Sequence, residues 1–248
     1  MRYFAEIAYN GTRFLGWQIQ PNGITVQAQC NHALSTVLHT PVYVVGCGRT
    51  DTGVHASYYI MHFDYEGTFP ENVLVRLNAC VGPDVAFRRL APVAEGAHAR
   101  FDAYSRSYQY IVSTEKNPFR QETAYYFPFA KQFDIAKAQE CAALLLEYKN
   151  FITFCKKGGE ETSNLCYLTA SYWEEDPENK LLKFNITSNR FLRGMVRLVV
   201  GATLNVGIGK YELATVKHAL DTKTLIPKAW TAPAHGLFLT DVKYPFEF

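Results

Sequence analysis

The chain has 248 residues, 48% of them apolar, and a net charge of +2 from 25 Lys and Arg against 23 Asp and Glu. This composition excludes a disordered chain, and the near balance of charges excludes a protein that coats nucleic acid through a basic tail. No apolar run reaches bilayer length, no charged-then-apolar leader opens the chain, and none of the six cysteines forms a Cys-x-x-Cys pair. We therefore expect a cytoplasmic globular protein with reduced thiols, no membrane segment and no zinc knuckle.

The first half of the chain predicts the order β-α-β-β-α-β followed by one more strand. Apolar residues recur at helical spacing after residue 25, alternate or cluster in the strand segments, and the second helix stops at Gly82-Pro83. The predicted strands cover residues 2–10, 42–47, 54–65, 85–91 and 104–114, and the predicted helices cover 25–39 and 71–80.

The second half repeats similar elements after a linker at residues 116–119. Helices are predicted over 134–147, 191–206 and 211–220, and strands over 165–174, 180–188 and 237–244. We expect an α/β (α+β) protein of two ferredoxin-like halves, residues 1–115 and 116–248, that form a mainly antiparallel central sheet flanked by helices.

The loop over residues 48–56, Gly-Arg-Thr-Asp-Thr-Gly-Val-His-Ala, gathers chemically active side chains between two predicted strands. We expect the hydroxyls of Thr50 and Thr52 to bond neighbouring backbone and fix the turn, so that Asp51 projects from a stiff, partly dry loop. A nearby arginine favours an ionised carboxylate, which can act as nucleophile, as base or as the stabiliser of a developing cation. The alternative is an ordinary turn in which Asp51 caps its own loop.

The triplet at residues 51–53, Asp-Thr-Gly, also raises the aspartic proteases, in which two carboxylates share one proton. The chain has a single copy of it, preceded by Gly48-Arg49-Thr50 and not by an apolar strand, and is rich in predicted helix. An arginine beside the pair would hold both carboxylates as anions, so the pattern disfavours a protease.

Five blocks of the chain, in order, resemble the tRNA pseudouridine synthase A family and span nearly the whole sequence. They are residues 11–18 (GTRFLGWQ), 49–56 (RTDTGVHA), 97–101 with 107–110 (AHARF and SYQY), 189–197 (NRFLRGMVR) and 233–239 (PAHGLFL).

The resemblance implies an isomerase that converts uridine to pseudouridine in the anticodon stem-loop of tRNA, at tRNA positions 38, 39 and 40. A glycosidic C–N bond breaks, the uracil turns and a C–C bond forms to the same sugar, so neither cofactor nor metal is needed. The implied partner is tRNA, and the implied assembly is a homodimer. An RNA-binding module without catalysis is the alternative, against which the intact residues Asp51, Arg49, Tyr108 and Arg197 argue.

Roles for individual residues follow from the same resemblance. Asp51 would be the catalytic carboxylate and Arg197 its partner, while Arg49 would hold the flipped nucleotide. Tyr108 would stack on the target uracil. The remaining residues expected at the RNA are His98, Arg100, Phe101, Arg106, Lys156, Lys157, Arg190 and Arg193.

Two patterns support these assignments. Arg190, Arg193 and Arg197 are spaced by three and four residues, which predicts one shared face of the helix at 191–206. Its opposite face is expected in the core through Leu192, Met195, Val196, Val199 and Val200. In the strand at 104–114, we expect Tyr110 and Val112 in the core and Ser107 and Gln109 on a polar face. His55 and His98 are expected as hydrogen-bonding props.

The segment over residues 155–164 departs most from the family pattern. It keeps Lys156 and Lys157 but adds Glu160 and Glu161, whose charges would repel phosphate. The sequence therefore predicts either that these glutamates face away from the RNA or that this loop grips tRNA differently.

Overall fold

The structure is a computed structural model that describes residues 1–156 and 163–248. The chain forms two compact units: unit 1 contains Met1–Arg106 and Phe238–Phe248, and unit 2 contains Ser107–Leu237. The boundary of the units lies inside a strand, and the last strand belongs with unit 1. The division into residues 1–115 and 116–248, which was based on element order, remains a prediction about domains.

Unit 1 has the predicted β-α-β-β-α-β order. Its elements are β1 (Arg2–Tyr9), α1 (Val26–Leu38), β2 (Val45–Gly46), β3 (His55–Asp64), α2 (Val73–Val81), β4 (Val85–Val93) and, from Phe238 onward, β9 (Leu237–Lys243). The strands are ordered β4-β1-β3-β9, and β2 pairs with β3. The neighbours of β1 are antiparallel to it, whereas β9 runs parallel to β3. This is the expected mainly antiparallel, ferredoxin-like arrangement.

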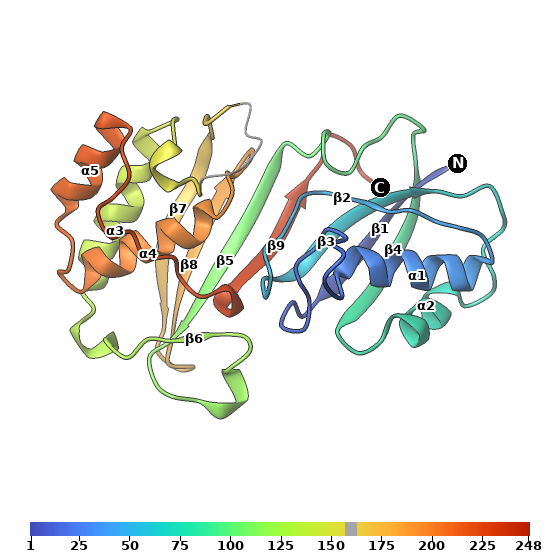
Figure 1. The fold of residues 1–248 in the computed structure, drawn as a ribbon, viewed down its shortest axis with the longest axis horizontal. Helices are drawn as coiled ribbons and strands as arrows, with labels where there is room; N and C mark the ends of the chain where they lie inside the picture. Colours follow the sequence, from blue (N-terminus) through green and yellow to red (C-terminus); the bar gives the residue numbers. More distant parts are fainter. Residues whose placement is uncertain (157–162) are drawn as a thin grey trace. The chain divides into compact units, whose positions relative to one another are not determined.

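Alternation along β1 divides the sheet of unit 1 into two faces. Figure 1 shows α1 and α2 together on one of them. Helix α1 begins at Val26 because the Thr25 hydroxyl accepts a hydrogen bond from the backbone N–H of Ala28 (3.3 Å). On the other face the fully buried ring of Phe4 packs against Tyr244, Phe246 and Phe248 from the end of the chain.

The predicted strand at 42–47 is wrong in length, because only Val45 and Gly46 form β2. The backbone before them bonds instead to side chains of α1. The N–H of Val42 donates to the Ser35 hydroxyl (2.8 Å), and the N–H of Val44 donates to the Asn31 side chain (2.9 Å). These hydrogen bonds replace the pairing that a strand would need.

Apart from the short strand β6 and the last helix α5, unit 2 follows the succession strand, helix, strand, strand, helix. Its helices are α3 (Ile135–Leu144), α4 (Met195–Gly207) and α5 (Leu213–Thr222), and its strands are β5 (Ser105–Ser113, from Ser107 onward), β6 (Tyr125–Tyr126), β7 (Leu168–Asp176) and β8 (Leu181–Ser188). The strands are ordered β5-β8-β7, with β6 parallel to β5 and β7 antiparallel to β8. Helix α3 packs against α4, α5 and β7.

Helix α4 begins later than predicted. Gly194 takes a left-handed conformation (φ +69°) just before the first helical residue, Met195. Arg190 and Arg193 therefore lie in the loop before the helix, and only Arg197 is helical. The prediction of three arginines on one helix face is wrong, because spacing alone does not locate the first turn. The apolar residues of the predicted core face are all buried, as expected.

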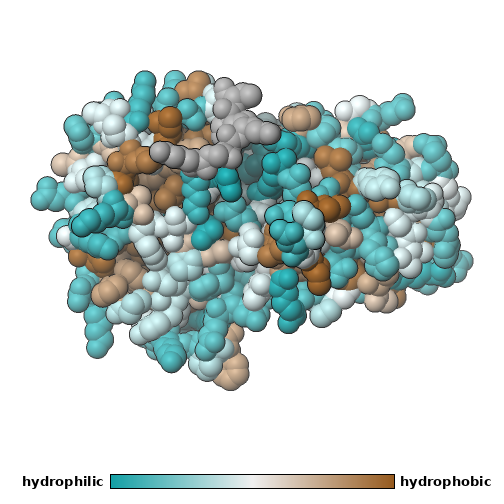
Figure 2. Space-filling view, viewed as in Figure 1, coloured by the Kyte–Doolittle hydropathy of each residue, from teal (hydrophilic) through white to brown (hydrophobic). Residues whose placement is uncertain are grey.

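Surface composition agrees with a globular chain. Figure 2 shows hydrophilic side chains over most of the visible face, with apolar side chains in small groups. Among the residues that the structure describes, no helix is long and apolar enough to cross a membrane.

Candidate active site

The loop over residues 48–56 leads from β2 into β3 in unit 1. Asp51 is half-buried, whereas Arg49, two residues before it, and Thr52, directly after it, are exposed. The side chain of Thr50, directly before the carboxylate, is buried. The expected partly dry position of Asp51 is thus confirmed.

Two tyrosine hydroxyls from the sheet hold this loop. The Tyr9 hydroxyl of β1 shares a hydrogen bond with the Thr50 hydroxyl (2.8 Å), and the Tyr59 hydroxyl of β3 donates to the carbonyl of Gly48 (2.6 Å). The ring of Tyr59 is stacked on Trp17 with centroids 4.2 Å apart. The expected bond from Thr50 to neighbouring backbone is replaced by a bond to a distant side chain. Buried partners of this kind fix the loop more firmly than a local turn does.

A second segment, residues 11–17, crosses the loop as backbone. The carbonyl of Thr50 accepts from the N–H of Trp17 (3.2 Å), and the N–H of Gly53 donates to the carbonyl of Phe14 (3.4 Å). Gly16 adopts φ +84°, and a Cβ there would collide with the Thr50 carbonyl and lie 3.1 Å from the carbonyl carbon of Asp51. Only glycine permits this approach of the two backbones.

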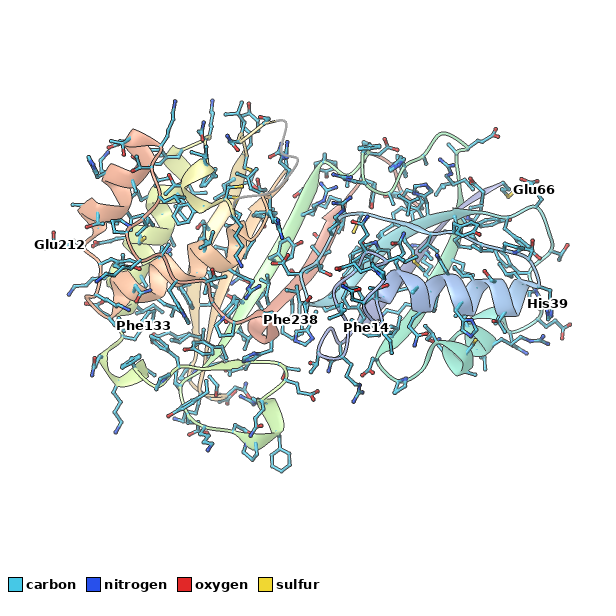
Figure 3. All side chains as sticks on the ribbon, viewed as in Figure 1. Phe14, His39, Glu66, Phe133, Glu212 and Phe238 are labelled. Carbon is cyan, nitrogen blue, oxygen red and sulfur yellow. The ribbon has the colours of Figure 1, made fainter. Side chains whose placement is uncertain are left out.

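His55 closes the loop as a prop. Its Nδ1 accepts a hydrogen bond from the N–H of Gly11 (3.0 Å), and its ring stacks on Phe238 of β9 with centroids 4.5 Å apart. Phe14 and Phe238, both labelled in Figure 3, come from two of the segments that contact the loop in unit 1. The prediction for His55 is confirmed.

The turn over residues 97–103 presents the ring of Phe101, which is 74% exposed. His98 supports the turn from inside: its Nδ1 accepts from the N–H groups of Arg100 (3.1 Å) and Phe101 (3.3 Å). His62 of β3 does the same for Ala99, whose N–H donates to its Nδ1 (3.1 Å). The expected role of His98 as a prop is confirmed, and the RNA contacts of this turn stay a prediction.

Burial is the main cause that lowers the pKa of both histidines, followed by the nearby charge of Arg2. For His62 the pKa falls to about 4. Both rings are therefore neutral at physiological pH, which the hydrogen bonds accepted by their Nδ1 atoms require.

Arg106 donates hydrogen bonds to the backbone both beside the Asp51 loop and in the 97–103 turn. Its Nε (3.2 Å) and one terminal nitrogen (2.9 Å) donate to the carbonyl of Cys47, at the start of the loop. The guanidinium also donates to the carbonyls of Arg100 (2.7 Å) and Ala103 (3.0 Å) in the turn. An RNA contact by Arg106 stays a prediction, although at least four of its hydrogen bonds are directed at protein.

In unit 2, β5 carries Tyr108 with its ring edge-on to Phe191, at a centroid distance of 5.2 Å and an interplanar angle of 90°. Two residues on, the Tyr110 hydroxyl donates to the carbonyl of Pro233 (2.8 Å), and the ring is fully buried. The core position of Tyr110 is confirmed, as is that of Val112, and stacking of Tyr108 on a base stays a prediction.

The opposite face of β5 is polar, as expected. Ser107 shares a hydrogen bond with Thr187 of β8 (2.9 Å), and the Gln109 amide donates to Asn185 (2.9 Å). These pairs use the two faces of the strand for different purposes.

Arg197 is anchored in the first turn of α4. Its Nε donates to the carbonyl of Ala232 (2.7 Å), and its own carbonyl accepts from the N–H of Ala232 (3.0 Å). The side chain is half-buried, and its charge adds to burial in lowering the pKa of His235.

The other expected cations of unit 2 gather before α4. The N–H of Lys156 donates to the carbonyl of Arg193 (3.0 Å), and a Cβ at Gly194 would meet the Lys156 stem at 2.9 Å. The side chain of Arg193 is exposed and that of Arg190 is half-buried. Lys157, Glu160 and Glu161 lie outside the described residues.

The candidate residues are thus divided between the units. Asp51, Arg49 and the turn at 97–103 belong to unit 1, whereas Tyr108 and Arg197 belong to unit 2. The pairing of Asp51 with Arg197 stays a prediction. In the described part of the chain, no three His, Cys, Asp or Glu side chains gather as metal ligands.

The sequence pattern did not predict that Tyr9 and Tyr59 bond to the loop, nor that Arg106 links the loop to the 97–103 turn. Gly16 and Trp17 could have been found, because both lie in the motif at residues 11–18. The two tyrosines carry no local signal, since each reads as an ordinary strand residue.

Comparison with known proteins identifies the family. A sequence model described as tRNA pseudouridine synthase matches residues 142–245. Proteins named tRNA pseudouridine synthase A align over almost the full length: one from Parabacteroides distasonis is 41% identical over 99% of this chain and 97% of its own. One from Bacillus subtilis is 36% identical over 98% of this chain and 99% of its own. This chain belongs to the tRNA pseudouridine synthase A family.

Proposed function

We propose that this protein isomerises uridine to pseudouridine in the anticodon stem-loop of tRNA, with Asp51 as the catalytic carboxylate. The observation that supports this most is the placement of Asp51 in unit 1. Asp51 is half-buried on a loop in which Thr50 and Gly48 are hydrogen-bonded to Tyr9, Tyr59 and Trp17. A catalytic group must be held within about 0.5 Å of its working position, and hydrogen bonds from β1, β3 and the 11–17 segment support such a placement.

The reaction needs little more than a placed carboxylate and a displaced base. The bond from C1′ to N1 of uracil breaks, the ring turns, a bond forms from C1′ to C5, and the hydrogen at C5 leaves as a proton while N1 gains one. Asp51 either attacks C1′ or removes a sugar proton, and both routes require its ionised form.

The other roles are parts of the same proposal. Arg197 is the second catalytic residue of the proposal, and its bond to Ala232 fixes the direction of its side chain. Tyr108 offers its ring to the extruded uracil, a contact worth about 1–3 kcal/mol, and Phe191 orients that ring. Exposed Arg49 holds the flipped nucleotide.

RNA contacts of the proposal come from both units. In unit 1 they are the turn residues His98, Arg100 and Phe101, and in unit 2 they are Lys156, Arg190 and Arg193. Extrusion of a stacked uridine costs a few kcal/mol. Phosphate contacts with several cations can offset this free-energy cost without any reading of base identity. A homodimer in the cytoplasm completes the proposal, by resemblance to the family and because tRNA is the substrate.

The experiment follows tritium released from tRNA labelled at C5 of uracil. We expect release by the wild type and a loss of at least about a thousandfold for Asp51→Asn, which keeps the shape of the side chain but removes its charge. Unimpaired release by Asp51→Asn would refute the role of Asp51. Tight tRNA binding by the wild type without any release would favour an RNA-binding module. An anticodon stem-loop without uridine at tRNA positions 38, 39 and 40 should release no tritium.

A further inference from the structure

Arg106 bridges two segments that are far apart in the sequence. Its side chain reaches Cys47, 59 residues away, and the Arg100 and Ala103 carbonyls of the exposed turn. The guanidinium lies alongside the loop, because a Cβ at Gly48 would be 4.0 Å from its Nε.

The number of bonds argues against a primary contact with phosphate. A guanidinium has five N–H donors in a planar fork, and phosphate is gripped by two parallel N–H groups. Arg106 directs at least four hydrogen bonds at protein, and these four reach three backbone carbonyls. Its charge also offsets the partial negative charge of three converging carbonyl oxygens, which few other side chains could do.

The two bridged segments have different tasks in the proposed function. Cys47 directly precedes the loop that carries Asp51, and the next carbonyl, that of Gly48, is held by Tyr59. Arg100 and Ala103 flank exposed Phe101 in the turn expected at the RNA. One rigid fork therefore sets the distance between a surface that receives RNA and a loop that performs chemistry.

We propose that Arg106 is a positioning residue, which places the Asp51 loop relative to the 97–103 turn so that RNA seated on the turn meets the carboxylate in register. The inference rests on the proposed function and deepens it. Misplacement of a reacting group by about 1 Å can cost a hundredfold in rate, so the effect belongs in kcat and not in KM.

The test uses Arg106→Lys, which keeps the positive charge but has a compact ammonium that cannot span three carbonyls. With full-length protein and tRNA, we expect kcat to fall by about 10- to 100-fold, with KM and its salt dependence within twofold of wild type. Arg100→Gln should do the reverse, raising KM severalfold and lowering the salt slope by about one. Arg88→Lys, another guanidinium bonded to a carbonyl of unit 1, should leave all three unchanged.

Hydrogen exchange without RNA supplies a second reading that does not depend on activity. Arg106→Lys should speed amide exchange in peptides over 47–54 and 97–103 together, whereas Arg88→Lys should change neither. If the wild type makes no pseudouridine, the proposed function fails, and the exchange result alone tests whether Arg106 links the loop to the turn. Unchanged exchange in both peptides overturns the positioning role of Arg106. So does an Arg106→Lys enzyme with normal kcat, raised KM and a smaller salt slope, because that outcome marks a phosphate ligand.

Discussion

The loop at 48–56 in unit 1 and the segment at 189–197 in unit 2 differ in how their functional side chains are placed. The loop is bonded to side chains and backbone from β1, β3 and the 11–17 segment, with Thr50 buried beside Asp51. The segment places Arg193 at the surface and lets a left-handed Gly194 start the helix. A group that makes or breaks bonds must be placed to within a few tenths of an ångström, whereas the attraction between a cation and a phosphate acts over several ångströms. Buried hydrogen bonds are therefore found at the carboxylate loop, whereas the segment that carries Arg193 has an exposed cation beside a left-handed glycine.

The largest expected effect comes from Gly16→Ala. The new Cβ would have to displace the Thr50 carbonyl, so we expect a loss of about 3 kcal/mol in the free energy of unfolding and near loss of tritium release. Gly209→Ala in unit 2 is the matched control, because Gly209 also has positive φ (+71°) but open space around it. It should cost only about 1 kcal/mol and keep activity. Equal effects of the two substitutions would show that backbone strain alone is responsible.

The pH dependence of stability tests the support that His62 gives to the 97–103 turn in unit 1. The neutral form of His62 is favoured in the folded protein, with a pKa lowered to about 4 by burial, while the unfolded chain titrates near 6.5. Between these values the unfolded state binds more protons, so stability falls as pH falls, by about 2 kcal/mol from pH 7 to pH 5. Urea unfolding measures this loss. His62→Asn keeps an acceptor for Ala99 but does not titrate, and an equally steep loss in that variant would remove His62 as the cause.

The Tyr9–Thr50 hydrogen bond should matter less than the glycine. Thr50→Val removes the buried hydroxyl at nearly constant volume, and we expect a loss of about 1–2 kcal/mol in stability and a severalfold lower kcat. Thr50→Ser should restore both. Adding Tyr9→Phe to Thr50→Val should cost little more, since the two side chains act as one pair. Strictly additive effects in this double-mutant cycle would contradict a shared role.

The smallest effect is expected for Arg193→Gln in the segment of unit 2. The side chain is exposed, so stability and kcat should stay unchanged. Loss of one phosphate contact should raise KM severalfold and reduce the slope of affinity against salt by about one. An unaltered salt slope would mean that Arg193 does not face the RNA. A fall in kcat instead would mean that the cations of unit 2 need placement as strict as that of the loop.

Local sequence patterns predicted most elements, because helix and strand periodicity is visible within a few residues. They failed where a local pattern competes with a neighbour. The segment at 42–47 has strand composition, but Ser35 and Asn31 of α1 take its N–H groups. The spacing of Arg190, Arg193 and Arg197 fits a helix, but the left-handed Gly194 delays the helix to Met195.

The sequence by itself determined the order of elements, the family, and the motif that carries Asp51, since all three reside in residues adjacent along the chain. Only the tertiary structure decided what holds that motif. Tyr9 and Thr50 are 41 residues apart and Arg106 and Cys47 are 59 apart. The physical reason is that a hydrogen bond depends on distance in space, and strand pairing, not sequence spacing, brings these groups within 3 Å.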